Sequence, residues 1–442
     1  MTETTRAGGD IANRGYAVVA ERLWDGVADT AQAGMAVWVE GDQIKTICPA
    51  SQLPEGLPRI EHGDATVLPG LIDAHVHYTA FSGPLLLAAG VTTVRDTAND
   101  LDWILEQRAH NQAQPSEGPR IVCCGRALDG PNAHWPNLGL SHPTIDALRD
   151  SVRYEAERGV DQIKFYVRLK PDWLAAGIDE AHRQGLRAIA HMEDTKAEDA
   201  VQAGLDEIEH FAGCDAAWNA NTPEERDTLI DLFLEHGVAA IPTLLVHDRL
   251  GRVRDAVFQY DTRNRWVHPT YLDFWRRYPL RNDPPNLRLH WQQTVPNVKR
   301  FTRQALERGM TIAAGTDALF PGMVPGYVLH DELAAMVDAG IRPVAVLRAA
   351  TSVAADVLGL ADQVGRIAPG YAADLLVVGG DPLVEIDCVA DIRTVVRAGQ
   401  VLDRDALHAE VLRRHSWPLE DAMTRDLGLY VNQQIHTPVS KK

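Results

Sequence analysis

A strand–helix rhythm that begins at Val67 constrains the fold of this chain more than any other feature. Short apolar segments alternate with amphipathic stretches such as Asp172 to Gln184 and Pro223 to His236, and a glycine commonly stands just before the next strand. The strands are expected at residues 67–77, 91–97, 120–128, 161–167, 187–193, 206–210, 238–245 and 311–317. Eight βα units favour a closed parallel barrel over residues 67–365, with the active site at the carboxyl ends of its strands.

Further strand signals lie before and after this barrel, and Gly41-Asp42 is typical of a hairpin turn. They occupy residues 17–20, 35–39, 43–47, 372–378 and 392–396. We expect the first three to form a small antiparallel sheet and the last two to pair with it. Residues 1–66 and 366–405 would then form one small domain built from both chain ends. Residues up to about 15 are expected to be a tail, and residues 406–442 a helical and then irregular extension.

Composition excludes several classes of partner. The 442 residues are 45% hydrophobic and 24% charged, and their formal net charge of −18 argues against nucleic acid or an anionic membrane surface. The five cysteines show no C-x-x-C spacing, which is typical of reduced thiols in the cytoplasm. No signal-peptide core or membrane-length apolar run is evident. We therefore expect a cytoplasmic protein with a small-molecule substrate; a homo-oligomer is compatible with these observations.

Polar side chains end several of the predicted strands. His75 and His77 are two residues apart on one strand, so both imidazoles leave the same face, as in a transition-metal site. His191, His210 and Asp317 end later strands at equivalent positions. The alternatives are a chance H-x-H pair among 17 histidines, core histidines with satisfied hydrogen bonds, and an Asp317 that caps the next helix.

Lys164 lies within the apolar run of the fourth strand, where a bare ammonium is costly. It can point outward between helices, or it can be desolvated, neutral and converted by carbon dioxide into an anionic carbamate that bridges two metals. Two divalent cations would bring four positive charges, and the carbamate, Asp317 and a bridging hydroxide would neutralise three of them. The one positive charge that is left suits the polarisation of a substrate carbonyl. Tyr166 shares the face of Lys164 and either polarises a substrate carbonyl or caps the barrel.

Three loop features bear on the substrate. The segment from about 246 to 300 is long and aromatic, which indicates a lid or pocket wall for an aryl substrate, or simply core packing. His134, after the third strand, is either a substrate contact or a solvated residue. Arg168, after the fourth strand, either binds a substrate carboxylate or pairs with a surface acid. His330, before Asp331-Glu332, is expected to be a helix-start residue and not a ligand.

Taken together, the motifs resemble those of the amidohydrolase superfamily, in its imidazolonepropionase-like and Xaa-Pro dipeptidase-like branch. The matching stretches, over residues 15–403, include VLPGLIDAHVH, GVTTVRDT, DQIKFY, GLRAIAHMED, GLDEIEHFAG, IPTLLV and AAGTDA, followed by the run from HDELAAM to GGDPL. This resemblance implies a distorted (β/α)8 TIM barrel with a small β-sandwich, and a binuclear centre, usually of zinc.

The same resemblance implies a role for each polar residue. His75, His77 and Asp317 would bind the more buried metal, and His191 and His210 the other. Carboxylated Lys164 would bridge the two ions.

The expected reaction is hydrolysis of an amide C–N bond by a metal-bridging hydroxide. Asp317 would pass a proton from the water to the leaving nitrogen. Tyr166 and His134 would act with it, and Arg168 would bind substrate. The substrate is expected to be a dipeptide or N-acyl amino acid. The alternatives are neutral aryl amides, ureas or carbamates, including xenobiotics, and a non-catalytic scaffold on the same fold.

Overall fold

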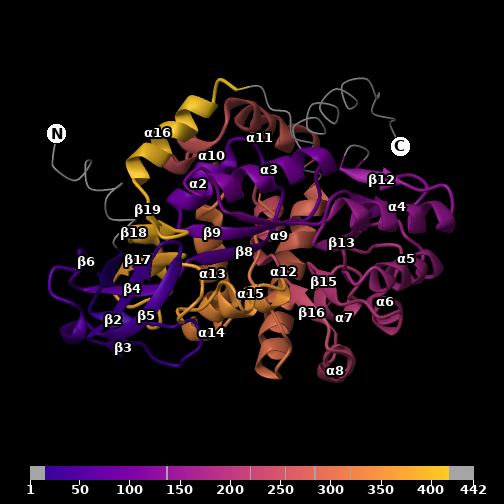
Figure 1. Ribbon diagram of the computed structural model, residues 1–442. Helices are drawn as coiled ribbons and strands as arrows, with labels where there is room; N and C mark the ends of the chain where they lie inside the picture. The colour runs from indigo at the N-terminus through magenta and orange to yellow at the C-terminus, as the bar shows by residue number, and fades with distance from the viewer. Residues whose placement is uncertain are drawn as a thin grey trace.

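The structure is a computed structural model that describes residues 15–135, 138–219, 221–253, 255–282, 285–318 and 320–417, without the side chains of residues 277–287. The expected tail before residue 15 and the irregular end of the 406–442 extension lie outside these residues. Parallel strands run through the middle of the molecule with helices around them, and the strands of the two chain ends lie together at one side (Figure 1). The chain is thus an α/β protein with parallel sheets.

The central strands form two parallel sheets. The three-stranded sheet, in the order β10-β9-β8, consists of β8 (Leu71–Val76), β9 (Val91–Asp96) and β10 (Arg120–Cys123). The six-stranded sheet, in the order β12-β11-β13-β14-β15-β16, consists of β11 (Ala127–Asp129), β12 (Gly139–Ser141), β13 (Gln162–Phe165), β14 (Arg187–Ala190), β15 (Glu207–Glu209) and β16 (Ala239–Ile241). Seven of the eight predicted strands are therefore confirmed, although most are shorter than expected.

Two predicted strands are each divided at a glycine. The first splits at Gly70, where an added Cβ would lie 2.2 Å from the hydroxyl of Thr92. The third splits near Gly125, which has a φ of +69° and whose added Cβ would lie 1.7 Å from the carboxylate of Glu155. Only glycine fits such close approaches. The prediction of one continuous strand over 67–77 and another over 120–128 was wrong. The pattern of apolar residues along the chain carries no information about these contacts with distant side chains.

The eighth predicted strand, 311–317, is not a regular strand. It makes isolated bridges, from Ile312 to Ala240 of β16 and from Ala318 to Val76 of β8. The backbone N–H of Ala74 also donates to the carbonyl of Ala314 at 2.9 Å. The segment therefore contacts the edge strands of both parallel sheets, although its pairing is too irregular for a continuous ladder.

Helices cover the outside of the parallel sheets. They are α2 (Ser82–Ala88), α3 (Leu101–Ala113), α4 (Ile145–Arg158), α5 (Pro171–Arg183), α6 (Ala197–Gln202), α7 (Asp215–Trp218), α8 (Pro223–His236), α13 (Tyr327–Asp338), α14 (Pro343–Ala349) and α15 (Ser352–Val357). Thr222 and Glu225 form a capping box at the start of α8, and Gly159 and Gly237 end α4 and α8 in the left-handed conformation. The helices predicted at 172–184 and 223–236 are confirmed.

The long segment after β16 is mostly helical. It contains α9 (Leu244–Gly251), α10 (Ala256–Gln259), η3 (Thr262–Trp266), α11 (Pro269–Asn282) and α12 (Pro285–Glu307). Tyr271, Phe274 and Trp275 of α11 are buried, so the core-packing reading of the aromatic residues holds for this helix. They pack with Phe81, beyond the carboxyl end of β8.

The two chain ends build two further sheets. One, in the order β5-β4-β1-β6, contains β1 (Tyr16–Val19), β4 (Met35–Glu40), β5 (Gln43–Pro49) and β6 (Arg59–Glu61). The other, in the order β19-β18-β17-β7-β2-β3, contains β2 (Arg22–Leu23), β3 (Gln32–Ala33), β7 (Ala65–Pro69), β17 (Leu375–Gly379), β18 (Ile392–Arg397) and β19 (Gln400–Val401). Short η2 (Ala50–Gln52) and η4 (Ile386–Ala390) turns and helix α16 (Arg404–Arg414) complete the described chain.

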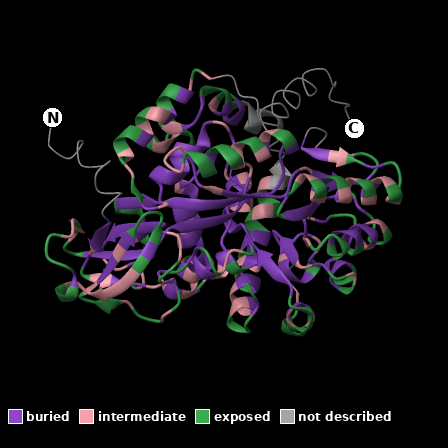
Figure 2. Cartoon of the chain, viewed as in Figure 1, coloured by how far each residue is buried: buried purple, intermediate pink, exposed green. Residues whose placement is uncertain are grey.

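Pairing of β17 with β7 confirms that strands from the two ends meet. The antiparallel pairing expected for residues 17–20, 35–39 and 43–47 is confirmed, because β1 pairs with β4 and β4 with β5. The expectation that the two C-terminal strands join this same sheet was wrong, because β17 pairs with β7 and β18 in the other sheet. The parallel strands are buried along most of their length, whereas the helices expose one face (Figure 2). Among the described helices, none combines the length and the apolarity that crossing a membrane requires.

Candidate metal centre

Three histidines surround the carboxylate of Asp317. The Nε2 atoms of His75 and His77 lie 3.4 and 3.3 Å from its Oδ1, and the Nε2 of His210 lies 3.9 Å from its Oδ2. His75, His210 and Asp317 offer ligand atoms that all lie within 4.8 Å of one another, which fits a shared metal ion. The shared face predicted for His75 and His77 thus brings both rings to the same carboxylate.

The opposite ring nitrogen of each of these histidines has a protein partner. Nδ1 of His75 donates to Glu209 at 2.6 Å, and Nδ1 of His77 donates to the carbonyl of Ala98 at 3.2 Å. Nδ1 of His210 hydrogen-bonds to the hydroxyl of Thr243 at 2.5 Å. Such partners fix the ring orientation and leave Nε2 as the ligand atom.

His191 and Lys164 lie in the same group. The ring of His191 is 4.7 Å from that of His210, and burial together with the Lys164 charge lowers the pKa of His191 to about 3. Burial also lowers the pKa of His210 well below its ordinary value. Both rings are therefore neutral, which is the form that binds a metal.

The amine of Lys164 is buried, and its Nζ has no hydrogen-bond partner in the described chain. Its nearest described anion is Glu209, at 3.7 Å. Burial lowers the pKa of Lys164, although the Glu209 charge opposes this. The lysine thus points into the interior, and the outward-facing alternative is wrong.

A buried ionic network lies beside Lys164. Arg95 of β9 donates to both carboxylate oxygens of Glu207, to Glu209 at 3.0 Å and to Gln162 at 2.8 Å. Burial would raise the pKa of Glu209, but His75, Lys164 and Arg95 together hold it well below its ordinary value. Glu209 is therefore an anion that links Arg95 to the ring of His75.

Asp73 ties the first strand to the segment that carries Asp317. Its carboxylate accepts from the backbone N–H and the hydroxyl of Thr316, at 3.0 and 2.7 Å, and burial raises the pKa of Asp73 to about 7. Asp317 follows directly, with a positive φ of 54°. Asp317 is thus held in place by the backbone and not as the cap of a following helix.

Backbone strain is concentrated at this centre. Among the described non-glycine residues, four with positive φ flank it: His210 (59°), Phe211 (52°), Thr243 (42°) and Asp317 (54°). Such conformations cost about 1–3 kcal/mol each and persist where surrounding contacts enforce them. At Thr243 the enforcing contact is Glu332, which accepts from the backbone N–H groups of Leu244 and Leu245 at 2.7 and 2.8 Å.

The three predicted substrate contacts lie in different environments. Tyr166 is partly buried, and its ring lies 5.3 Å from that of His191. His134 is exposed, with its ring 6.1 Å from that of Tyr166. Arg168 is exposed, and its guanidinium donates to the carbonyl of Asn132; no ion pair of Arg168 with an acid occurs in the described chain. Asp129, which the sequence did not single out, accepts from the backbone N–H groups of both His134 and Arg168.

Sequence reasoning also missed an aromatic cluster beside His210. His247 of α9 lies 5.9 Å from the His210 ring and 4.6 Å from the rings of both Trp218 and Trp291. The Nδ1 of His247 and the Nε1 of Trp291 are buried without a hydrogen-bond partner in the described chain. Only the aromatic content of residues 246–300 hinted at this cluster. His330 lies in the first turn of α13, as expected; it is buried, and its Nε2 bonds the Ala89 carbonyl.

Comparisons with known proteins place the chain in a family. The amidohydrolase family model matches residues 66–402, so the chain belongs to the amidohydrolase family. An uncharacterized protein of Mycobacterium tuberculosis is 28% identical over 339 residues, which is 72% of this chain and 80% of the relative.

Solved structures agree with the family. Bottromycin amidohydrolase is similar at 25% identity and a TM-score of 0.72, over 94% of each chain. A putative prolidase of Bifidobacterium longum is similar at 25% identity and a TM-score of 0.71, over 90% of this chain and 99% of that one. The resemblance to the superfamily and to its Xaa-Pro dipeptidase-like branch is confirmed, and the family and these neighbours support a hydrolytic enzyme.

Proposed function

We propose that this protein is a metal-dependent hydrolase that cleaves the C–N bond of a small amide. The observation that carries the proposal is the arrangement around Asp317. Three imidazoles direct Nε2 at one carboxylate while protein groups hold their Nδ1 atoms. Ring orientation by such partners is typical of metal ligands.

The donor set fits two divalent cations of the zinc type. His75, His77 and Asp317 would hold one, and His191 and His210 the other. A carboxylated Lys164 would bridge them, and the buried Nζ without a hydrogen-bond partner is what a lysine needs in order to be neutral and react with carbon dioxide. When bound, the cations would lower the pKa of a water and polarise the substrate carbonyl.

The chain's own residues would manage orientation and protons. Burial opposes ionisation of Asp317, but the adjacent His75 and His77 rings hold the pKa of its carboxyl well below its ordinary value. The ionised carboxylate would accept a proton from water. Asp317 would then deliver the proton to the nitrogen as the C–N bond breaks. Tyr166, beside His191, would hydrogen-bond the substrate, and His134 and Arg168 would contact it from the loops that Asp129 holds.

We also propose the fold that frames this site. The contacts of residues 311–318 with β16 and β8 support one distorted (β/α)8 TIM barrel over residues 67–365. The two end sheets would form a β-sandwich from residues 1–66 and 366–405. The barrel then brings the ligand residues of five strands to one end, as the function requires.

A dipeptide or N-acyl amino acid is the first substrate class. The similar putative prolidase supports it. The second class, neutral aryl amides, ureas or carbamates, is favoured by the cluster of Trp218, His247 and Trp291 beside His210, because aromatic walls bind planar apolar groups.

A hydrolysis screen of the zinc-loaded protein tests the proposal. It sets Xaa-Pro dipeptides and N-acyl amino acids beside matched neutral aryl amides, ureas and carbamates. Turnover of the acids supports the first class and turnover of the neutral aryl compounds supports the second. Failure to retain about two divalent ions per chain, with no turnover of either set, would contradict a metal-dependent hydrolase and leave a scaffold role.

Trp291→Leu separates the two classes further. The variant should lower kcat/KM for aryl substrates by about tenfold, because one aromatic contact contributes up to about 1.5 kcal/mol. The kcat/KM for aliphatic substrates should not change. Trp173→Leu is the matched control, because Trp173 packs on α5 against the main core.

A further inference from the structure

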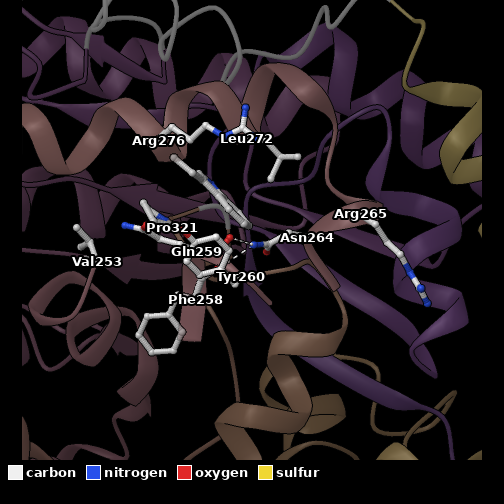
Figure 3. A pocket seen from close by; sticks show the side chains of 11 residues that line it. Val253, Phe258, Gln259, Tyr260, Asn264, Arg265, Leu272, Arg276 and Pro321 are labelled. Atoms are coloured by element: carbon white, nitrogen blue, oxygen red, sulfur yellow. Dashed lines mark hydrogen bonds between the residues drawn. The ribbon is translucent and has the colours of Figure 1, made fainter. Parts of the chain in front are cut away.

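A cavity of about 430 Å³ lies within the helical segment that follows β16. Its wall is mostly apolar and includes Val253, Phe258, Leu272 and Pro321 (Figure 3). Trp275 also lines it. This volume is within the range of small-molecule sites, about 300–1,000 Å³. None of the candidate metal ligands lines the cavity. We propose that it is a second binding site, for a small carboxylate with an aromatic or branched apolar body and an N–H donor.

The charge of the ligand follows from two arginines. Arg265 and Arg276 line the cavity, and neither forms an ion pair or hydrogen bond with the described chain. Four other arginines of this segment do pair with aspartates: Arg249 with Asp331, Arg252 with Asp248 and Asp255, Arg263 with Asp261 and Asp331, and Arg288 with Asp255. The Arg265 guanidinium stacks over the ring of Trp266, 4.5 Å from its centroid, and Arg276 is left as the cation without a partner of this kind. In a chain of net charge −18, guanidinium groups without acidic partners at one cavity favour an anion.

Three further polar residues line the cavity, Gln259, Tyr260 and Asn264, and Asn264 offers a buried acceptor. Asn264 uses its Nδ2 to bond the carbonyls of Phe258 and Gln259, which fixes the amide orientation. Its Oδ1 is buried and has no hydrogen-bond partner in the described chain. A ligand N–H would satisfy this oxygen, since a buried unpaired acceptor is unfavourable. The apolar wall then takes the body of the ligand, with Trp275 and Phe258 each only 6% exposed.

One apolar cluster is in contact with both the cavity wall and the surroundings of the candidate metal centre. Trp275 of α11 belongs to the apolar cluster that includes Ala98, whose carbonyl accepts from His77, and Leu272 and Tyr166 pack against that cluster. An occupant would therefore press on the helix that also packs near Tyr166. The binding site does not depend on the hydrolase proposal, because its own lining supplies every contact.

Binding is tested on the full-length protein by isothermal titration with anilinoacetate, which carries an aryl ring, an N–H and a carboxylate and has no amide bond to hydrolyse. Two analogues each lack one group. Replacement of the carboxylate in 2-anilinoethanol should weaken binding by about 10- to 100-fold, and replacement of the N–H in phenoxyacetate by about 2- to 10-fold. Equal affinity of anilinoacetate and 2-anilinoethanol would overturn the proposal.

Variants locate the binding. Arg276→Gln should weaken the binding of anilinoacetate by about tenfold or more and leave the affinity for 2-anilinoethanol unchanged. Leu272→Trp, which fills the cavity, should abolish the binding of both compounds. Arg308→Gln is the matched control, because Arg308 pairs with Asp227 and Asp231 away from the cavity. Unchanged affinity in both Arg276→Gln and Leu272→Trp, or binding that is lost when the metal is removed by dialysis, would place the carboxylate elsewhere and overturn the site.

Discussion

Glu209→Gln isolates the contribution of the anion behind His75. Glu209 and Glu207 lie on β15 two residues apart, both are fully buried, and both accept from Arg95. Only Glu209 also holds the Nδ1 of His75, at 2.6 Å. Glu207→Gln is therefore a matched control that loses a carboxylate on the same arginine without touching a candidate ligand.

The two variants should differ in metal binding and resemble each other in stability. Losing the partner of a ligating histidine typically lowers metal affinity by about 10- to 100-fold, so Glu209→Gln should show this loss and Glu207→Gln should not. Each variant leaves Arg95 one carboxylate, so each should lower the free energy of unfolding by about 2 kcal/mol, less than the roughly 3–5 kcal/mol for an uncompensated buried charge.

Competition of each protein with a chromophoric chelator for zinc measures the affinity, and urea unfolding of the metal-free proteins measures the stability. The reasoning fails if both variants lose zinc affinity equally, because the effect would then come from Arg95 and not from the His75 ring. It also fails if Glu209→Gln binds zinc as tightly as the natural sequence.

Three further predictions follow from single residues. Asp317→Asn should lower kcat by about 10²-fold or more, as loss of a proton-transfer group does, with little change in thermal midpoint; near-normal turnover would remove the proton role. Gly125→Ala should destabilise the fold strongly in urea, because the added Cβ would lie 1.7 Å from Glu155 in a residue with φ of +69°; unchanged stability would show that Glu155 moves freely. Burial raises the pKa of Glu155 to about 8, so the folded state holds a proton that the unfolded state has released, and stability should fall as pH rises from about 4.5 to about 8. Glu155→Gln should flatten that pH dependence in urea unfolding, and an unchanged slope would assign it to other groups.

Many helices and strands could be predicted from the local sequence pattern. The amphipathic helices at 172–184 and 223–236 and the hairpin at Gly41-Asp42 depend on residues close in the chain, so periodicity and turn chemistry found them. The interruptions of the predicted strands at Gly70 and Gly125 could not be predicted in this way. Each depends on a side chain from a distant segment, Thr92 or Glu155, that occupies the space of a Cβ.

The sequence by itself determined the chemistry available at the carboxyl ends of the strands. Alternation along one strand predicted that His75 and His77 share a face, and the strand rhythm placed His191 and His210 directly after later strands and Asp317 at the end of the irregular segment 311–317. The tertiary structure alone decided which nitrogen each ring presents, since Glu209, Ala98 and Thr243 occupy the Nδ1 atoms. It alone also set Trp291 and His247 beside His210. Hydrogen bonds and ring contacts between distant segments arise only when the chain packs, and no local period encodes them.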